Sequence, residues 1–467
     1  MQTPATPAPR DHWSSRLGFV LAAAGSAIGL GNLWKFPYIT WDNRGGAFVL
    51  VYLGCIAAVG LPIMMAEILI GRKTQTSVVG AFKQALGPRW RVVGGLGVAT
   101  GWILLGYYTV VAGWTLSYLA RCLRWSFTGY PSGYDPGGAF GSLVADGPVQ
   151  LVLSAAFMVL TVAVVYSGIG RGIERVSRVL MPALFGILLL LLVTALSMDG
   201  AGEALGFIFR PSFSELSWDG TLEALGHSFF TLSLGMGAML TYGSYLRRGE
   251  SVVRAATWVV ALDTLIALIA TVTMFSVIFS VAGMTDHVGR STAGMLFISL
   301  PELFYTAVPF GAILAPLFYL LVAFAALTST ISMLEVAVSY WIDERGVSRR
   351  RATLLSGAGI FVITALCGLS LGAWGPLSSF TVFGEKAGLF ATLDHLVANW
   401  LLPLGGLAIT LGAGWFLTRE ATRAELVDGS QPRWFRYGLW RFFIRYVSPL
   451  AVAAIILAVI FFGRDFS

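Results

Sequence analysis

Two pairs of glycines interrupt long apolar stretches and suggest a site that binds charged groups. Gly29 and Gly31 lie in the segment GSAIGLGNLWKFP, and Gly235 and Gly237 lie in FFTLSLGMGAMLTYGSY. A helix that breaks at such a point exposes amide groups to an anion and carbonyl oxygens to a cation. Close packing of helices through small residues is the alternative for either pair taken alone. Two pairs in one chain favour broken helices that line a cavity, where a bilayer tolerates irregular backbone.

Three polar side chains lie inside other apolar stretches. Thr328 and Ser329 are adjacent in AALTSTISMLE, and Asp263 lies in VVALDTLIALIA. The two hydroxyls either bond back to carbonyls one turn earlier in a helix or serve as oxygen ligands of a hard cation. An aspartate within a membrane span is costly unless it is paired or near an ion, so Asp263 is a functional candidate.

The composition predicts that these residues are carried by membrane-spanning helices. Of 467 residues, 56% are hydrophobic and 12% are charged, which is about half the charged share of a soluble domain. Apolar runs such as VLSAAFMVLTVAVVYSGIG are long enough to cross a bilayer core of roughly 30 Å. They do not alternate polar and apolar residues as barrel strands do. We therefore expect an all-α polytopic membrane protein with a single transmembrane domain.

We predict eleven membrane spans, and the distribution of Lys and Arg orients them. With a cytoplasmic N-terminus, 23 Lys and Arg residues lie inside and 8 outside, as the positive-inside rule requires. This split also argues against nucleic-acid binding by a chain of net charge +7. The C-terminus is then expected outside a cell (inner) membrane. The predicted spans are about 16–39, 46–71, 91–121, 149–168, 176–198, 220–246, 255–283, 308–341, 353–373, 390–417 and 446–463.

The two glycine-rich interruptions fall in spans 1 and 6, five spans apart. Corresponding breaks in two sets of five spans are typical of transporters built from an inverted repeat. We therefore expect a first repeat over about 10–200, a second over about 218–418 and an extra span at 446–463. The segment 418–445, rich in Arg and aromatic residues, is expected to be an interfacial loop on anionic lipid.

The chain resembles the neurotransmitter:sodium symporter family, in its bacterial amino-acid transporter branch. Four motifs carry the resemblance in order: WSSRLGFVLAAAGSAIGLGNLWKFPY, GGAF…PIMMAEILIGR, FFTLSLGMGAMLTYGSY, and AALTSTISMLE with YWIDE. The resemblance runs from about Arg10 to the tenth span. It implies sodium-coupled uptake of an amino acid by alternating access, in which spans 1, 2, 6 and 7 rock against the rest.

The resemblance also implies a substrate site between the two breaks. The substrate carboxylate would meet the amides of Leu30 and Gly31 and the Tyr108 hydroxyl. Its amine would meet the Ser233 hydroxyl and the carbonyls of Ala27, Phe230 and Thr231. The side-chain pocket would be mostly apolar, which favours a hydrophobic or aromatic amino acid, with ordinary helix packing as the alternative explanation for its two flexible methionines. It comprises Leu104, Tyr108, Val111, Phe230, Met236, Ser329 and Met333.

Two sodium sites follow from the same resemblance. The side chains of Thr328 and Ser329 would bind one ion with the carbonyls of Gly25, Ile28 and Ala325. A second ion would be held by the Ala27 carbonyl, Asn32, Thr231 and Asp263, where well-studied members have Asn. Chloride dependence and proton antiport stay open, because Ala267 replaces a glutamate that substitutes for chloride in several bacterial members. The candidates for a compensating charge or a proton are Asp263, His227 and Glu335.

Gates are implied on both sides of the site, although a solvated or snorkelling end group is the alternative for each charge. Outside, Lys35 and Asp394 would close as an ion pair and Phe230 would cover the substrate. Inside, Arg10 and Asp343 would pair, with Trp13 as a plug and Ser244 and Tyr245 as supports. Glu67 is expected to cap broken backbone near span 6. Some members unwind span 5 to admit water, which here corresponds to the stretch from Gly172 to Pro182.

Other classes of function are weighed against transport. The chain has four histidines and three cysteines, and no HExxH, Cys-His or Ser-His-Asp spacing, so it is not expected to be an enzyme. The dispersed cysteines fit packing rather than disulfides or metal binding; they are Cys55, Cys122 and Cys367. A receptor that binds the amino acid without transporting it stays an alternative. The oligomeric state and the exact substrate are left open.

Overall fold

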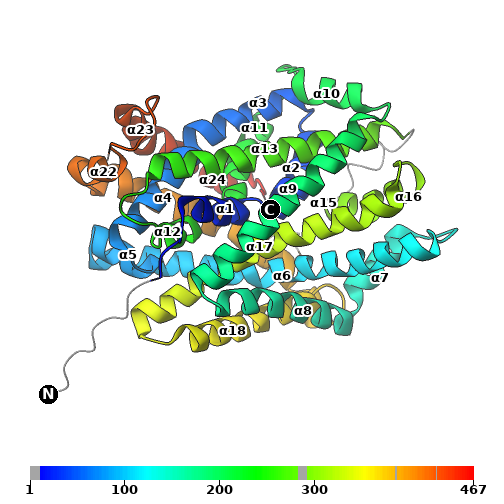
Figure 1. The fold of residues 1–467 in the computed structure, drawn as a ribbon, viewed down its shortest axis with the longest axis horizontal. Helices are drawn as coiled ribbons and strands as arrows, with labels where there is room; N and C mark the ends of the chain where they lie inside the picture. The colour runs from blue at the N-terminus through cyan, green and yellow to red at the C-terminus, as the bar shows by residue number, and fades with distance from the viewer. Residues whose placement is uncertain (1–10, 282–291, 384–386, 428, 467) are drawn as a thin grey trace.

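A computed structural model describes residues 11–281, 292–383, 387–427 and 429–466, and every regular element in these ranges is helical. The long helices run roughly parallel to the long axis of the molecule, which is horizontal in Figure 1. The short helices α22 (Arg419–Leu426) and α23 (Tyr437–Phe442) lie at one end, and α7 (Pro136–Ala145), α10 (Ala201–Phe209) and α16 (Leu300–Thr306) lie at the other. The expected all-α class is confirmed.

Within the described ranges, nine continuous helices are long and apolar enough to cross a membrane. Several join α-helical and π-helical turns without a break. They are Gly46–Thr74 (α3 and α4), Pro88–Thr128 (with α6, Arg91–Thr128), Gly147–Tyr166 (α8), Ile169–Leu196 (with α9, Arg175–Leu196), Val252–Phe279 (α13), Gly311–Arg345 (α17), Arg349–Leu369 (α18), Leu389–Phe416 (α20 and α21) and Tyr437–Phe462 (α23 and α24).

The described residues therefore give nine spans, or ten when a bent pair near the N-terminus is counted as one. That pair corresponds to predicted span 1. Predicted span 6 is the segment absent from this count, because it consists of α11 (Trp218–Thr231) and α12 (Ala238–Gly243), neither of which is long enough alone. The count of eleven thus stays a prediction.

The last span begins earlier than the sequence predicts. We expected a helix over 446–463 and a loop over 418–445, but a continuous helix starts at Tyr437, so the loop prediction is wrong for its final third. The two arginines that hid this helix are accommodated by neighbours. Arg441 donates to the carbonyls of Ala413 (2.8 Å) and Leu417 (3.2 Å). The Arg445 guanidinium lies 4.1 Å from the Trp415 ring centroid.

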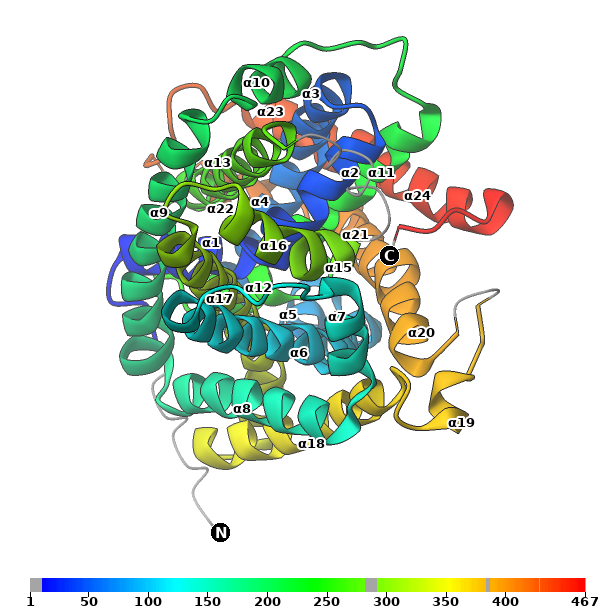
Figure 2. The ribbon, with the colours of Figure 1, turned by 90° about the vertical axis from the view of Figure 1, so that its right-hand side faces the viewer.

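The core of the bundle lies around α1 (Arg16–Ala27), α6, α13 and α17. Helix α17 packs along α6, and α1 packs against both α13 and α17. Helices α8, α9 and α24 lie at the periphery (Figure 2) and expose large apolar side chains such as Val159, Val193 and Leu450. Apolar exposure on peripheral helices is what a lipid-facing surface requires.

The two predicted breaks are sites of irregular backbone next to this core. Helix α1 ends at Ala27, and a π-helical turn over Gly31–Lys35 continues into α2 (Phe36–Asp42). The combined helix Gly31–Asp42 is bent by 51° from α1. Between α11 and α12, Gly235 has a φ of +85° and Gly237 a φ of +78°. The glycines therefore allow backbone that other residues adopt only with strain.

A substitution at Gly235 tests directly whether the second break needs glycine. A Cβ there would lie 2.4 Å from the Leu402 carbonyl oxygen, at a φ that also disfavours a side chain. Gly235→Ala is expected to destabilise the fold by about 1–3 kcal/mol, measured as a lower melting midpoint in detergent. Gly186→Ala is the matched control, because Gly186 lies within α9 with nothing near its missing Cβ. Equal midpoints for both variants would contradict this account of the break.

Candidate functional site

A buried cavity lies between the two breaks. It is lined by thirteen residues from α1 and the turn after it, α6, the α11–α12 connection, α17 and α21. Ten of the twelve predicted substrate residues are among them. Leu30 and Val111 are buried close by but do not line it. The lining residues are Ser26, Ala27, Gly29, Gly31, Leu104, Tyr108, Phe230, Thr231, Ser233, Met236, Ser329, Met333 and Leu402.

Three lining residues were not predicted. Ser26 and Gly29 lie within the same span-1 motif, directly next to the predicted Ala27 and Leu30, so including the immediate neighbours of the predicted residues would have found them. Leu402 comes from α21 (Leu402–Leu411), in an apolar stretch without any local polar feature. Only the close approach of its carbonyl to Gly235 brings it to the cavity.

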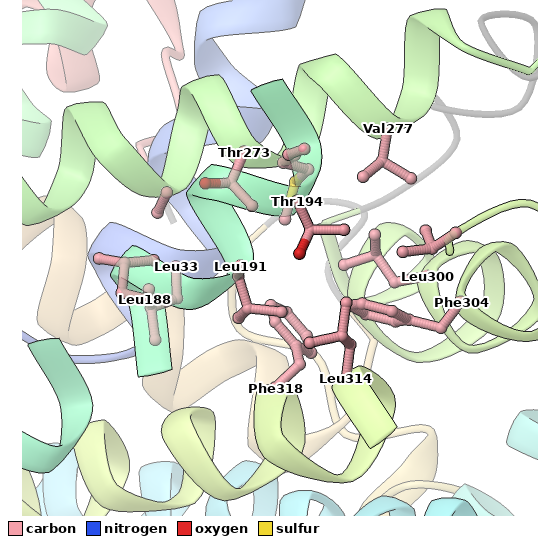
Figure 3. A pocket seen from close by; sticks show the side chains of 14 residues that line it. Leu33, Leu188, Leu191, Thr194, Thr273, Val277, Leu300, Phe304, Leu314 and Phe318 are labelled. Carbon is pink, nitrogen blue, oxygen red and sulfur yellow. The ribbon is translucent and has the colours of Figure 1, made fainter. Parts of the chain in front are cut away.

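A second, more apolar cavity lies elsewhere in the bundle. Figure 3 shows its side chains, which come from α9, α13, α16, α17 and the turn at Leu33. Only Thr194 and Thr273 bring hydroxyls to it, and none of the predicted substrate or sodium residues line it. An amino acid has two charged groups that need partners in a dry cavity, so the cavity between the breaks suits it better.

The polar groups of the first cavity pair with one another. The Leu30 amide donates to the Tyr108 hydroxyl at 3.1 Å, so these two predicted carboxylate partners are already adjacent. The Ser233 and Ser329 hydroxyls both donate to the Ser26 carbonyl, at 2.8 Å and 3.3 Å. A zwitterion entering the cavity would exchange these bonds for bonds to itself.

The predicted ligands of the first sodium site lie together where α1 meets α17. Thr328 donates to the Ala325 carbonyl at 3.0 Å, and Ser329 lies 3.5 Å from the Ile28 carbonyl. A Cβ on Gly25 would lie 3.0 Å from the Thr328 Cβ, so the two backbones approach closely. Thr328 does bond back within its helix, as one reading of the sequence expected. A hydroxyl that donates its proton keeps lone pairs for an ion.

Three of the four predicted ligands of the second sodium site, the side chains of Asn32, Thr231 and Asp263, form one buried cluster. The Asn32 amide donates to Asp263 Oδ1 at 2.8 Å and to Thr231 Oγ1 at 3.1 Å. Thr231 in turn donates to Asp263 Oδ2 at 3.2 Å. Asp263 is fully buried in α13, and among these three side chains it alone can carry a charge. An ionised Asp263 would offer a cation a negative ligand, whereas a protonated one would act as the Asn of well-studied members does.

His227 lies beside this cluster with unpartnered nitrogens. It is buried, and both ring nitrogens lack a hydrogen-bond partner among the described residues. Its ring stacks on Phe36 at 5.6 Å and lies 6.3 Å from the Phe230 ring. Ala267 is buried one turn beyond Asp263 in α13. Chloride dependence and proton antiport therefore both stay open hypotheses.

Trp13 is buried at the end of the molecule from which the chain enters α1. Its indole donates to the Tyr242 carbonyl at 3.0 Å and its amide to the Tyr245 carbonyl at 3.2 Å. Ser244 lies in the same turn, with its hydroxyl on the Thr241 carbonyl. Asp343 lies near the end of α17, but Arg10 falls outside the described residues, so their pairing stays a prediction.

Two hydrogen-bond networks around glutamates at this end of the molecule were not predicted from the sequence. The Tyr245 hydroxyl donates to Glu335 at 2.6 Å, and Arg349 binds the same carboxylate at 2.8 Å and 3.0 Å. Glu174 accepts from the Ser14 amide at 2.9 Å and from Arg178 at 2.6 Å. For the second network, the available signal was a single glutamate among three arginines in GRGIERVSR.

Glu174 belongs to the stretch where span 5 is expected to unwind. In this structure the stretch is helical: a π-helical segment, η4 (Ile169–Glu174), runs directly into α9. Gly18 of α1 lies so close to Glu174 that a Cβ added to Gly18 would overlap the Glu174 carboxylate. Glu174 therefore joins the N-terminal segment to the start of span 5.

Glu67 and Lys35 complete the candidate site. Glu67 accepts from the amides of Gly235 (2.8 Å) and Leu240 (3.3 Å), which is the predicted capping of broken backbone. At the other end, Lys35 Nζ lies 5.4 Å from the Phe230 ring centroid. Its predicted partner Asp394 lies in α20 (Leu389–Leu396), and the ion pair stays a prediction.

Comparisons with known proteins agree with this geometry. The sodium:neurotransmitter symporter family model matches residues 10–129 and 141–464. An uncharacterized sodium-dependent transporter of Bacillus subtilis, YhdH, is 36% identical, with 96% of this chain and 97% of that protein covered. The bovine sodium-dependent dopamine transporter is 23% identical, with 96% and 68% covered.

A solved structure is also similar to this one. It is the crystal structure of MhsT in complex with L-phenylalanine, which is 38% identical with a TM-score of 0.87, covering 96% of this chain and all of the other. The residues of the cavity and of the Thr328 and Asp263 clusters all lie within the part of the chain that the family model matches. The chain therefore belongs to the sodium:neurotransmitter symporter family, a family of membrane transporters and not of enzymes.

Proposed function

We propose that the protein is a sodium-coupled symporter that imports an amino acid with a hydrophobic or aromatic side chain. The observation that carries the proposal is the position of the cavity, which shares Thr231 with the Asn32–Thr231–Asp263 cluster and Ser329 with the Thr328 cluster. A substrate and two cations would then contact the same short stretches of backbone, which is the arrangement that couples their binding.

The lining of the cavity supports the substrate class. Leu104, Met236 and Met333 provide an apolar wall, and Phe230 lies over it. The similar protein MhsT has been solved with L-phenylalanine. Flexible methionines can repack around side chains of different shape, so we propose a range of large apolar amino acids rather than one.

The transport cycle follows from which elements meet at the cavity. We propose that the substrate carboxylate displaces Tyr108 from the Leu30 amide while its amine engages Ser233 and nearby carbonyls. Sodium and substrate enter from the Lys35 side when spans 1 and 6 move away from spans 3 and 10. They leave from the Trp13 side after the contacts of Trp13 and Glu174 break.

The proposal includes the full topology predicted from the sequence. Counting the α11–α12 pair as span 6 gives eleven spans, with repeats over about 10–200 and 218–418 and an extra span at the end. The Trp13 end then faces the cytoplasm and the Lys35 end faces outward across the cell membrane. Two neighbouring breaks with irregular backbone support this reading.

A receptor that binds without transport is the alternative with the same site, and a symporter with added proton antiport is a second. Concentrative uptake into vesicles with an imposed sodium gradient separates transport from reception. Uptake with an opposed proton gradient tests the antiport, and replacement of chloride by gluconate tests chloride dependence.

Asp263→Ala is expected to abolish sodium-dependent amino-acid binding, because it removes the one charged ligand of the second cluster. Asp263→Asn, which keeps the shape and a carbonyl oxygen, is expected to bind sodium more weakly than the parent but better than alanine. Binding of radiolabelled amino acid as a function of sodium concentration measures both. Glu203→Gln, an exposed carboxylate in α10, is the control. Unchanged sodium affinity in Asp263→Ala would contradict the assignment of Asp263 as a sodium ligand.

Competition for uptake tests the substrate class. In proteoliposomes with a sodium gradient, leucine, phenylalanine and tryptophan are expected to compete with the labelled substrate, since their side chains fill the apolar wall. Glycine and GABA are expected to compete poorly, because neither buries a side chain there. Leucine outcompeted by glycine would overturn the proposed specificity.

Glu174→Gln is expected to speed amide hydrogen exchange in residues 172–182. The variant weakens charge-assisted bonds from Ser14 and Arg178, each worth about 1.5–3 kcal/mol, so exchange should rise by about tenfold or more. Mass spectrometry with and without sodium is the measurement, and Glu203→Gln is again the control. Full protection in both variants without sodium would count against unwinding of span 5.

A further inference from the structure

Residues 463–466 turn back across the end of the molecule that carries Lys35. Helix α24 (Ser448–Phe462) ends at Phe462, and Gly463 follows with a φ of +59°, the left-handed conformation that reverses chain direction after a helix. The following three residues, Arg464, Asp465 and Phe466, run toward α20 and α21 (Figure 2). We call residues 463–466 the strap.

The strap is anchored on span 10 through a buried asparagine. Asn399 lies in the π-helical turn Val397–Leu401 and is fully buried. Its Oδ1 accepts from the Phe466 amide at 2.8 Å, and its Nδ2 donates to Asp465 Oδ1 at 2.8 Å. His395 Nδ1 lies 3.4 Å from the same Asp465 oxygen. A buried amide needs both of its polar groups paired, and here the strap supplies partners for both.

The strap also contacts spans 1 and 6. Lys35 Nζ donates to the Phe466 carbonyl at 2.5 Å, and Arg464 pairs with Asp219, in the first turn of α11, at 2.6 Å. The Phe466 side chain packs on Gly226 of α11, where an added Cβ would lie 3.6 Å from the Phe466 Cβ. Phe466 and Phe230 line one small hollow together, and Phe230 also lines the substrate cavity, so the strap lies next to the residue predicted to cover the substrate.

We propose that the strap is a built-in lid that clasps spans 1 and 6 to span 10 and must be released before substrate can enter. The inference rests on the proposed function, in which those spans separate when the Lys35 side opens. A segment bonded to both sides of that opening cannot keep all of its contacts while the opening widens. Release of the strap therefore precedes or accompanies each opening.

The contacts of the strap differ in expected weight. Arg464 and Asp219 are about half exposed (48% and 45%), and such surface pairs contribute little. The bonds to the fully buried Asn399 and the packing of the half-buried Phe466 on Gly226 are less exposed than this pair and should carry most of the closure. This contrast supplies a matched pair of variants within the strap, Phe466→Ala and Arg464→Ala.

Accessibility of a cysteine beneath the strap tests the lid directly. Ala398 lies in the hollow that Phe466 lines. The Ala398→Cys variant is labelled with a membrane-impermeant methanethiosulfonate, and the parent without this cysteine gives the background labelling. Phe466→Ala is expected to raise the labelling rate in sodium-free buffer by about tenfold, and Arg464→Ala by less than about twofold. Equal labelling rates for Ala398→Cys alone, with Phe466→Ala and with Arg464→Ala would overturn the proposal.

A reversible lock provides the second measurement. A disulfide requires Cβ atoms about 3.5–4.5 Å apart, which the spacing of Gly226 and Phe466 satisfies. The double variant Gly226→Cys with Phe466→Cys is expected to lose sodium-driven uptake on oxidation and regain it with reductant. Each single variant should be insensitive to both treatments.

The outcomes separate the lid from the proposed function. Failure of the disulfide to form, or undiminished uptake by the oxidised double variant, overturns the lid while leaving a working transporter. Absence of sodium-driven uptake in the parent overturns the proposed function, and the lid as a step of transport falls with it.

Discussion

The structure depends on one constraint, which is that backbone amides and carbonyls inside a membrane must find partners. Two helices break near the centre of this bundle, and polar neighbours provide partners for several of the freed groups. Glu67 accepts two amides of the second break, and the Tyr108 hydroxyl accepts one amide of the first. The breaks are thus held open by specific side chains, and a cavity with its own polar groups remains between them.

The proposed coupling follows from residues that belong both to the cavity and to a predicted sodium site. Thr231 lies both in the cavity and beside Asp263, and Ser329 lies both in the cavity and beside Thr328. A cation in either cluster would order the backbone that the substrate uses, so each ligand would be expected to strengthen the binding of the other. In the proposed cycle, Trp13 with Glu174 would hold one end closed, and Lys35 with the strap would hold the other.

Much of this arrangement could be predicted from sequence, and the remainder required contacts between distant segments. Glycines at Gly235 and Gly237 signalled a break because positive φ is a local property. The resemblance brought Asn32, Thr231 and Asp263 together, since the motif positions are specific. Glu174, Leu402 and the strap were missed because their partners lie on other elements, which neither composition nor periodicity can identify. The early start of the last helix was hidden by arginines whose charges are satisfied by tertiary contacts.

The central claim is that sodium and an apolar amino acid bind together between the breaks. The most direct test is equilibrium binding of radiolabelled L-phenylalanine to the purified protein in detergent, measured over a range of sodium concentrations with potassium as the replacement ion. The account predicts that affinity rises steeply with sodium and is lost in potassium, and that the amino acid raises sodium affinity by the same factor. Equal affinity for the amino acid in sodium and in potassium would contradict it.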